Sequence, residues 1–478
     1  MIFKQKKLNI KCVVMAMGLL ILFQATTNAS NPVEKLIMPI MEPVLIKALK
    51  AQNLRIKCSV NDHFAAHTPV SVVFFYPKPI PSETIVHALE NVLSTFSIFA
   101  GTLTEEEGQL YINCNNQGVL VQGVHSDRSL FQQLAHFDEM KSSFVELINP
   151  SKTVKQQGPL LTIKLSYYND GMAIGYCWHH SLGDMATFME FIKALSSFAR
   201  GQSYNPPIIV EDRQGYLQNF VYRADCMPQL KCLSWMDLLR CVPTYFSSKK
   251  SVYLYFTHSE LESLRSALSE QVGQKLSRND VLCAHLIHML ARCRNDDATE
   301  QYASVITNTR SRTGMPLHVL GNYLGAITIQ SNKSQTKDAL ASSIHKAVKE
   351  FRPDDPVQVL KVIEQQGGMK SIKWMIPPVF LPQYKNLIIT NWSNFGVYSI
   401  DFGVVSPHLF LSIGESPMPW ISCIVEGFNN RGLLAMLILP NSVANRLTEP
   451  DMLKQIHQYQ DQMTPEEELV LQQNMWCM

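Results

Sequence analysis

The sequence lacks an excess of charge of either sign. Lysine and arginine together number 42 and aspartate and glutamate 40 among 478 residues, so the formal net charge is +2 at pH 7. A protein whose main partner is DNA or RNA generally carries a clear basic excess that neutralises phosphates. The even balance of charge therefore argues against a nucleic-acid partner.

Motifs that hold metal ions or reactive nucleophiles are also missing. The 11 cysteines lie between Cys12 and Cys477 and form neither a C-x-x-C pair nor a Cys/His cluster at zinc-ligand spacing. We therefore expect most of them to be small core residues, and we predict neither a metal site nor a permanently bound cofactor. The G-x-S-x-G motif is not matched either, because residues 414–418 read Gly-Glu-Ser-Pro-Met.

Beyond residue 30 the chain has no apolar run of about 18 residues, the length that a membrane-spanning helix requires. Residues 1–29 differ from the rest. Four lysines precede the apolar run Cys12–Phe23, and small and polar residues lead up to Ala29. This order is typical of a secretory signal peptide and predicts export. A membrane-anchored protein with an uncleaved leader and a cytoplasmic protein are the alternatives.

The length and the apolar content of 46% suit two globular domains of roughly 200 residues each. We predict an N-terminal domain over residues 30–205, a proline-containing crossover linker over 206–250 and a C-terminal domain over 251–478. Strand and helix patterns alternate in both halves, so the fold class is α/β. Turn residues at Asn115–Gly118 and Asn169–Gly171 predict two β-hairpins.

One junction between a strand and a helix carries polar residues that could do chemistry. A strand predicted over Met172–Trp178 runs into His179, His180 and Asp184, and apolar residues then recur at helical spacing. A histidine four residues before an aspartate is a weak signal, because helices place such pairs on one face for structural reasons. The end of an apolar strand is, however, where open α/β sheets place functional groups.

The residues from His180 to Asp184 match the HxxxD motif of the BAHD acyltransferases and of their superfamily, which includes chloramphenicol acetyltransferase and peptide-synthetase condensation domains. Further segments resemble the family in the same order: Ser97–Thr102, Leu276–Ala284, Asn308–Arg312 with Gly321–Gly325, and Thr390–Trp392 with Tyr398–Pro407. The chain departs from the family at Thr102, where Arg is usual, and from Asp401 onward, where DFGWG reads DFGVV. It resembles a divergent member.

The resemblance implies two chloramphenicol-acetyltransferase-like domains, each a mixed β-sheet flanked by helices, with an active-site channel between them. It also implies transfer of an acyl group from a thioester, with acyl-CoA as co-substrate, to a hydroxyl or amine of a small-molecule acceptor. His180 would act as general base, since a neutral imidazole suits removal of the acceptor proton. No covalent acyl-enzyme is then required.

The other site residues are assigned through the resemblance. Asp184 would orient the His180 loop by pairing with Arg310, rather than act as a second base. Thr390 and Trp392 would donate hydrogen bonds to the oxyanion, although Trp392 can also be a core aromatic. The remaining assignments are supporting roles, which fall to His179, Asp401, Phe402 and Gly403. No residue can be assigned to binding of the CoA moiety.

Two other interpretations stay open. A metal site could use His179, His180 and Asp184, but it needs further ligands that the sequence does not supply. A catalytically degenerate ligand-binding protein on the same fold would explain the departures at Thr102 and DFGVV. The predicted export also conflicts with a cytosolic acyl-CoA donor, so another acyl carrier is an alternative. We expect a monomer, and neither the acceptor nor the preferred acyl chain follows from the sequence.

Overall fold

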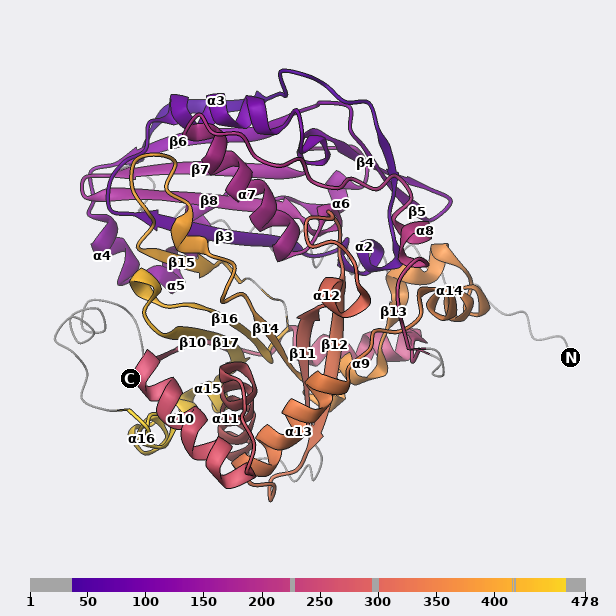
Figure 1. Ribbon diagram of the computed structural model, residues 1–478, viewed down its shortest axis with the longest axis vertical. Helices are drawn as coiled ribbons and strands as arrows, with labels where there is room; N and C mark the ends of the chain where they lie inside the picture. The colour runs from indigo at the N-terminus through magenta and orange to yellow at the C-terminus, as the bar shows by residue number, and fades with distance from the viewer. Residues whose placement is uncertain (1–36, 224–227, 295–300, 415, 417, 461–478) are drawn as a thin grey trace, which may run out of the picture.

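The computed structural model of the protein describes residues 37–223, 228–294, 301–414, 416 and 418–460. The signal peptide predicted over residues 1–29 lies outside them. Two six-stranded β-sheets, one above the other in Figure 1, organise the chain, and helices pack against each sheet. Within the described ranges, no helix combines the length and the apolar character needed to span a membrane.

The first sheet has the strand order β1-β6-β7-β8-β3-β15, and all neighbours are antiparallel except β6 and β7. Helices α3 and α7 pack together across one face of this sheet (Figure 1). The bounds are β1 (Ile37–Ile46), β3 (Pro69–Tyr76), β6 (Val119–Ser126), β7 (Leu161–Tyr168), β8 (Gly171–His179), β15 (Leu409–Ser412), α3 (Ser82–Val92) and α7 (Met185–Ala199).

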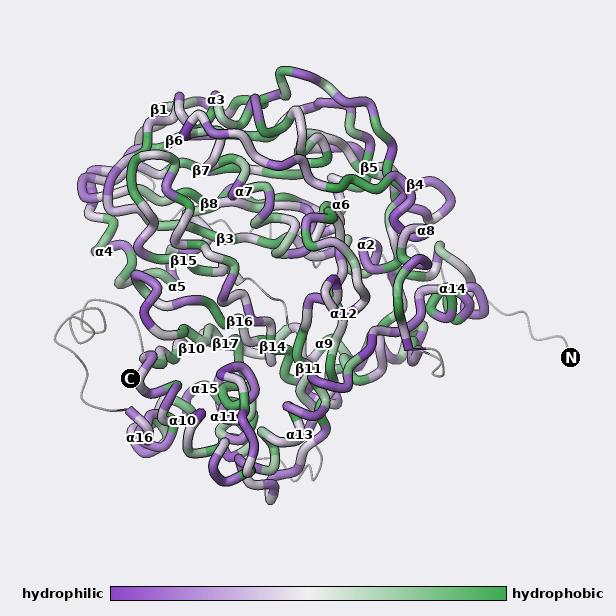
Figure 2. Tube along the Cα trace, in the orientation of Figure 1, coloured by the Kyte–Doolittle hydropathy of each residue, from purple (hydrophilic) through white to green (hydrophobic). Residues whose placement is uncertain are grey.

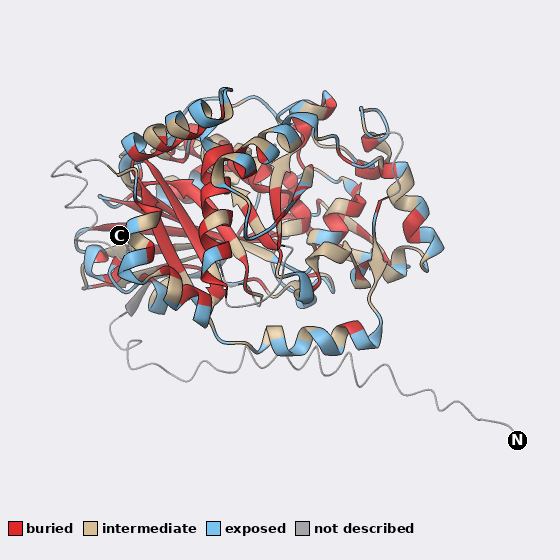
Figure 3. Ribbon diagram, turned by 90° about the horizontal axis from the view of Figure 1, so that it is seen from below, coloured by how far each residue is buried: buried red, intermediate tan, exposed pale blue. Residues whose placement is uncertain are grey.

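Strand β8 leads to the predicted catalytic histidine and lies in the centre of the first sheet. All nine of its residues are buried because chain covers both of its faces. At Gly175 an added Cβ would lie 1.9 Å from the carbonyl oxygen of Phe144, so only glycine permits this close packing. Hydrophobic residues predominate along the central strands in Figure 2, and Figure 3 shows buried strands in the interior and exposed faces on the outer helices.

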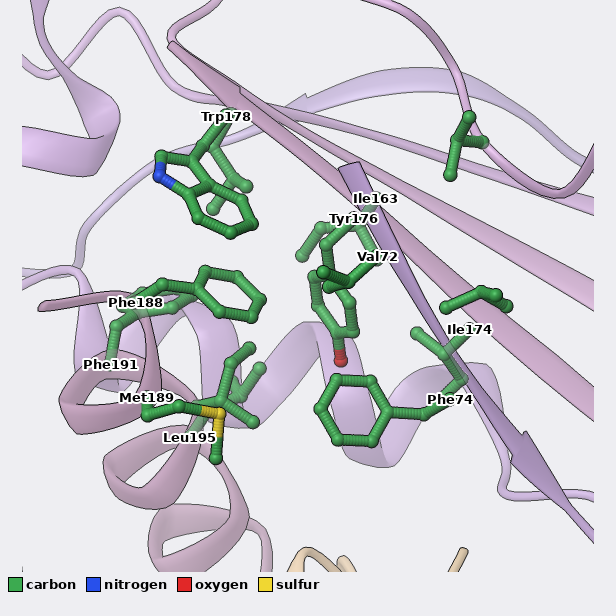
Figure 4. Packing of buried hydrophobic residues seen from close by; sticks show 14 of the residues in the cluster. Val72, Phe74, Ile163, Ile174, Tyr176, Trp178, Phe188, Met189, Phe191 and Leu195 are labelled. Carbon is green, nitrogen blue, oxygen red and sulfur yellow. The ribbon is translucent and has the colours of Figure 1, made fainter. Parts of the chain in front are cut away.

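Aromatic packing joins β8 to α7. Figure 4 shows the indole of Trp178 above the ring of Phe188, whose centroids lie 4.0 Å apart with parallel planes. Tyr176 on the same strand makes an edge contact with Phe188 at 5.5 Å. Because these residues flank the turn between β8 and α7, the packing limits how that turn can move.

The second sheet has the order β10-β17-β16-β14-β11-β12. Its strands are β10 (Lys249–Phe256), β11 (Gln301–Asn308), β12 (Leu324–Ser331), β14 (Leu387–Asn391), β16 (Ile421–Glu426) and β17 (Leu433–Pro440). Helices α10 (His258–Val272), α11 (Arg278–Cys293), α13 (Lys337–Glu350), α15 (Asn441–Leu447) and α16 (Pro450–Ile456) form a layer beside it (Figure 1). Tyr253, Val425 and Met436 of this sheet join the core of the first, so the two sheets share packed side chains.

Shorter elements complete the fold. Strands β2 (Arg55–Lys57), β4 (Thr102–Glu106) and β5 (Gln109–Asn113) make a small sheet, and β9 (Lys231–Cys232) pairs with β13 (Met375–Ile376). The short helices are α2 (Val60–Ala65), α4 (Leu130–Leu134), α5 (Phe137–Met140), α6 (Pro150–Thr153), α8 (Arg213–Leu217), α9 (Trp235–Tyr245), α12 (Arg310–Thr313) and α14 (Pro356–Gln365). Short 3-10 helices lie at Ser97–Ala100, Lys141–Phe144, His180–Leu182, Met369–Trp374, Pro378–Phe380, Pro382–Tyr384, Val397–Ser399 and Phe428–Asn430.

The predicted α/β class and the two sheet-rich domains are confirmed. Strand β15, however, comes from the second half of the chain and pairs with β3 of the first sheet. It satisfies backbone groups that β3 would otherwise expose at an edge, so the first sheet extends beyond residues 30–205. The hairpin at Asn169–Gly171 is confirmed, but the one at Asn115–Gly118 is wrong, because β5 and β6 enter different sheets.

Candidate functional site

The candidate site lies where β8 gives way to α7. Strand β8 ends at His179, a 3-10 turn, η4, spans His180–Leu182, and Asp184 caps α7 by accepting a hydrogen bond from the amide of Thr187 at 3.0 Å. At Gly183 an added Cβ would lie 2.5 Å from Thr187 side-chain atoms. The tight turn therefore requires glycine and places His180 one turn before the helix.

Asp184 forms a buried two-point ion pair with Arg310. The Arg310 nitrogens donate to the two Asp184 oxygens at 2.8 and 3.1 Å, and both side chains are at most 1% exposed. Burial alone would raise the pKa of Asp184, but the charge and hydrogen bonds of Arg310 outweigh it and hold the pKa below the usual 3.8. The pair thus joins the start of α7 to the segment between β11 and β12.

The oxygens of Asp184 have further partners. One accepts from the amide of Thr187 and the other from the amide of Tyr323, each at 3.0 Å, in addition to Arg310. A carboxylate whose two oxygens are both engaged by donors is poorly placed to accept a substrate proton or to ligate a metal. This arrangement favours the orienting role over the second-base and metal-site alternatives.

His180 is half-buried, and burial lowers its pKa below the ordinary 6.5, so the imidazole is neutral near pH 7. Its Nδ1 is buried, and interaction with the side chain of Asn322 opposes the lowering of the pKa without reversing it. Neighbouring His179 is fully buried, and burial lowers its pKa to about 3. Its Nδ1 accepts a hydrogen bond from the amide of Ser181 at 3.3 Å, so His179 shapes the turn as a neutral side chain.

A second buried ion pair adjoins the same turn and was not predicted. Arg213 of α8 donates to Asp62 of α2 at 3.1 Å, and both side chains are at most 1% exposed. Asn322 also donates to Asp62, at 2.8 Å. The sequence does show a capping box at Ser59 and Asp62, but such a motif indicates only where a helix starts. Nothing local in the sequence connects Arg213 or Asn322 with His180.

Thr390 and Trp392 lie at the end of β14 in the second sheet. Thr390 is paired with Ile306 of β11 and Cys423 of β16, and Trp392 packs against the core of the first sheet. Both are half-buried, and no described residue accepts a hydrogen bond from the Thr390 hydroxyl or the Trp392 indole N–H. Both donors are therefore available, and within the described ranges neither is hydrogen-bonded to His180.

The Asp401-Phe402-Gly403 segment lies at the other end of α7. Arg200, directly after the helix, donates a hydrogen bond to Asp401 at 2.6 Å. Phe402 is buried, and its ring centroid lies 6.1 Å from that of Tyr76. Since α7 has 15 residues, it separates this segment from Asp184 by about 22 Å. The segment therefore anchors the helix and does not adjoin His180.

Residues 39–441 match the family model described as the Transferase family. The chain belongs to this family, that of the BAHD acyltransferases. Shikimate O-hydroxycinnamoyltransferase of Nicotiana tabacum is 25% identical over 399 residues, which cover 78% of this chain and 88% of the relative. The family resemblance and the class of enzyme, an acyltransferase for groups other than aminoacyl groups, are thus confirmed.

Solved structures support the fold. Vinorine synthase aligns with a TM-score of 0.66 at 17% identity and covers 87% of this chain and 98% of its own. TRI101 of F. graminearum, crystallised with coenzyme A and T-2 mycotoxin, aligns with a TM-score of 0.67 at 14% identity over 84% of this chain and 98% of its own. The roles of individual site residues and the channel between the domains stay predictions.

Proposed function

We propose that the protein transfers an acyl group from acyl-CoA to a hydroxyl or amine of a small-molecule acceptor, with His180 as general base. The observation that carries the proposal is the position of His180 on a turn held by the buried Asp184–Arg310 pair, in a chain of the BAHD family. The relative crystallised with coenzyme A supports CoA as the carrier.

The proposed step begins when the acceptor oxygen or nitrogen bonds to the thioester carbonyl carbon. As this bond forms, the acceptor proton passes to His180, and we expect Nε2 to receive it because Nδ1 is buried. The tetrahedral intermediate then collapses, the carbon–sulfur bond breaks, and the imidazolium returns the proton to the thiolate. His180 therefore ends as it began, and no acyl-enzyme forms.

Negative charge on the carbonyl oxygen needs a hydrogen-bond donor in that intermediate. We assign this role to the Thr390 hydroxyl and the Trp392 indole N–H, because both are available donors at the strand end of the second sheet. One such donor stabilises a transition state by about 3 kcal/mol in other enzymes. Substrates would reach the site through the channel that the family resemblance implies.

The test measures release of free CoA thiol from acetyl-CoA and longer acyl-CoAs with a panel of alcohols and amines. We expect turnover with at least one pair, and loss of about 100- to 10,000-fold in kcat for His180→Ala, the usual contribution of a general base. Unchanged turnover in this variant would remove His180 from the mechanism. Binding without turnover in the wild type would favour the ligand-binding alternative, which the altered DFGVV segment suggests.

The compartment of the protein is a separate proposal. The basic and apolar order of residues 1–29 supports export or N-terminal anchoring, and we infer a monomer. Cell fractionation with N-terminal sequencing of the mature chain tests the leader. An intact Met1 in the soluble cytosolic fraction would contradict the signal peptide and remove the conflict with a cytosolic acyl-CoA donor.

A further inference from the structure

Four consecutive backbone carbonyls of the histidine turn each accept a hydrogen bond from a side chain. Asn322 donates to the carbonyl of His180 at 2.7 Å, and Trp178 donates to that of Gly183 at 3.1 Å. Between them, the two terminal nitrogens of Arg213 donate to the carbonyls of residues 181 and 182, each at 3.0 Å. The turn is therefore held at every residue from 180 to 183.

Asp62 organises these donors. One of its oxygens accepts from Arg213 at 3.1 Å and from the side chain of Asn322 at 2.8 Å, while the other accepts from the amide of Ser59 at 2.8 Å. Its backbone carbonyl also accepts from the hydroxyl of Ser181 at 2.9 Å. The residue is fully buried, so a single carboxylate fixes two donors that reach the turn from distant parts of the chain.

A short segment connects this arrangement with the Asp184–Arg310 pair. Asn322 lies between Gly321, whose carbonyl accepts from Arg310 at 3.0 Å, and Tyr323, whose amide donates to Asp184. The amide of Asp184 donates to the same Gly321 carbonyl at 3.3 Å. Residues 321–323 are thus bonded to both ion pairs, one on each side of the histidine turn.

We propose that Asp62, Arg213 and Asn322 are positioning residues that hold His180 in its reactive geometry through the backbone of its turn. We call these three residues the carbonyl clamp. The proposal rests on the proposed function, because it assumes that His180 is the base. Within the described residues, Asp62 and Arg213 make no hydrogen bond to the imidazole ring and act through the main chain, whereas the side chain of Asn322 also interacts with the ring directly.

The physical reason is that a general base must meet its proton within hydrogen-bond reach. A displacement of about 1 Å by a change away from the reacting atoms can reduce the rate roughly 100-fold. The guanidinium of Arg213 spans two carbonyls and Asp62 at once, which a lysine ammonium cannot reproduce although it keeps the charge. A lysine at position 213 would keep the positive charge but lose this geometry. Arg213→Lys therefore distinguishes a positioning role from a role that only balances the charge of Asp62.

The test uses Arg213→Lys and Asn322→Ala in the full chain, with acetyl-CoA and the acceptor that gives the highest turnover. Two matched controls lie in the second sheet region: Arg294→Lys removes a buried arginine that donates to the carbonyl of Lys385, and Asn386→Ala removes a buried asparagine bonded to Ser304. Thermal unfolding of each variant separates loss of fold from loss of geometry. His180→Ala, alone and combined with Asn322→Ala, completes the set.

We expect the clamp variants to lower kcat by about 10- to 100-fold with KM within about twofold, because the misplaced base acts only in the transition state. The controls should keep wild-type kcat at similar melting temperatures, and Asn322→Ala should cause little further loss once His180 is absent. Equal kcat for clamp variants and controls, or a full further loss in the His180→Ala background, would overturn the clamp alone. Wild-type turnover of His180→Ala itself would instead overturn the proposed function, and the clamp with it.

Discussion

The two ends of helix α7 are each tied to the second half of the chain by an aspartate–arginine pair, but the pairs differ in environment. At the N-terminal end the Asp184–Arg310 side chains are at most 1% exposed and meet at two points. At the C-terminal end Arg200 and Asp401 are 26% and 38% exposed. The buried pair adjoins His180, and the partly exposed pair lies about 22 Å away.

The two aspartate–arginine pairs use the same residue types but should contribute differently to stability. A buried pair depends on both partners, because a charge left alone in the interior is strongly destabilising. An exposed pair is screened by water and contributes little. The end of α7 next to His180 is therefore held by a pair on which stability depends, whereas the other end depends more on the apolar contact of Phe402.

The largest expected effect is at the buried end. Arg310→Met should lower the free energy of unfolding by about 3 to 5 kcal/mol, because it leaves Asp184 charged and unpaired in the interior. Urea denaturation at pH 7 measures this change in the free energy of unfolding. The double variant Asp184→Leu, Arg310→Met should recover most of the loss, short of about 1 kcal/mol for the missing helix cap. A double variant as unstable as Arg310→Met would contradict the unpaired-charge explanation.

Acidification should reduce the contribution of Asp184 to the free energy of unfolding, by an amount between the effects of the substitutions at Arg310 and Arg200. The pKa of Asp184 in the folded protein lies below its usual 3.8, so its contribution to stability is complete above that value and declines as the pH falls below it. The difference in unfolding free energy between wild type and Asp184→Asn should therefore be constant from pH 7 to 5 and shrink towards pH 3. If this difference in unfolding free energy grew on acidification, the direction given for the pKa shift of Asp184 would be wrong.

The smallest effect is expected at the exposed end. Arg200→Met should change the free energy of unfolding by no more than about 1 kcal/mol, since both side chains are partly exposed and solvent screens their attraction. It should also leave kcat in the thiol-release assay unchanged. A loss of several kcal/mol, equal to that of Arg310→Met, would remove the contrast between the two ends of the helix.

Local patterns in the sequence predicted much of the candidate site. His180 and Asp184 lie four residues apart at a strand–helix junction, so their spacing is visible in the sequence, and the hairpin at Asn169–Gly171 is set by its turn residues. The turn at Asn115–Gly118 looks similar but joins strands of two different sheets. Turn chemistry determines a change of direction, whereas the partner of each strand depends on the edges that the rest of the fold supplies.

The sequence by itself determined the α/β class, the family and the choice of His180 as the candidate base, because these follow from local periodicity and from short ordered motifs. Only the tertiary structure decided which residues hold that histidine in place. Asp62 lies 151 residues from Arg213 and 260 from Asn322, so no spacing in the chain could indicate their contact. The burial that makes their hydrogen bonds strong exists only after both halves of the chain have packed around the turn.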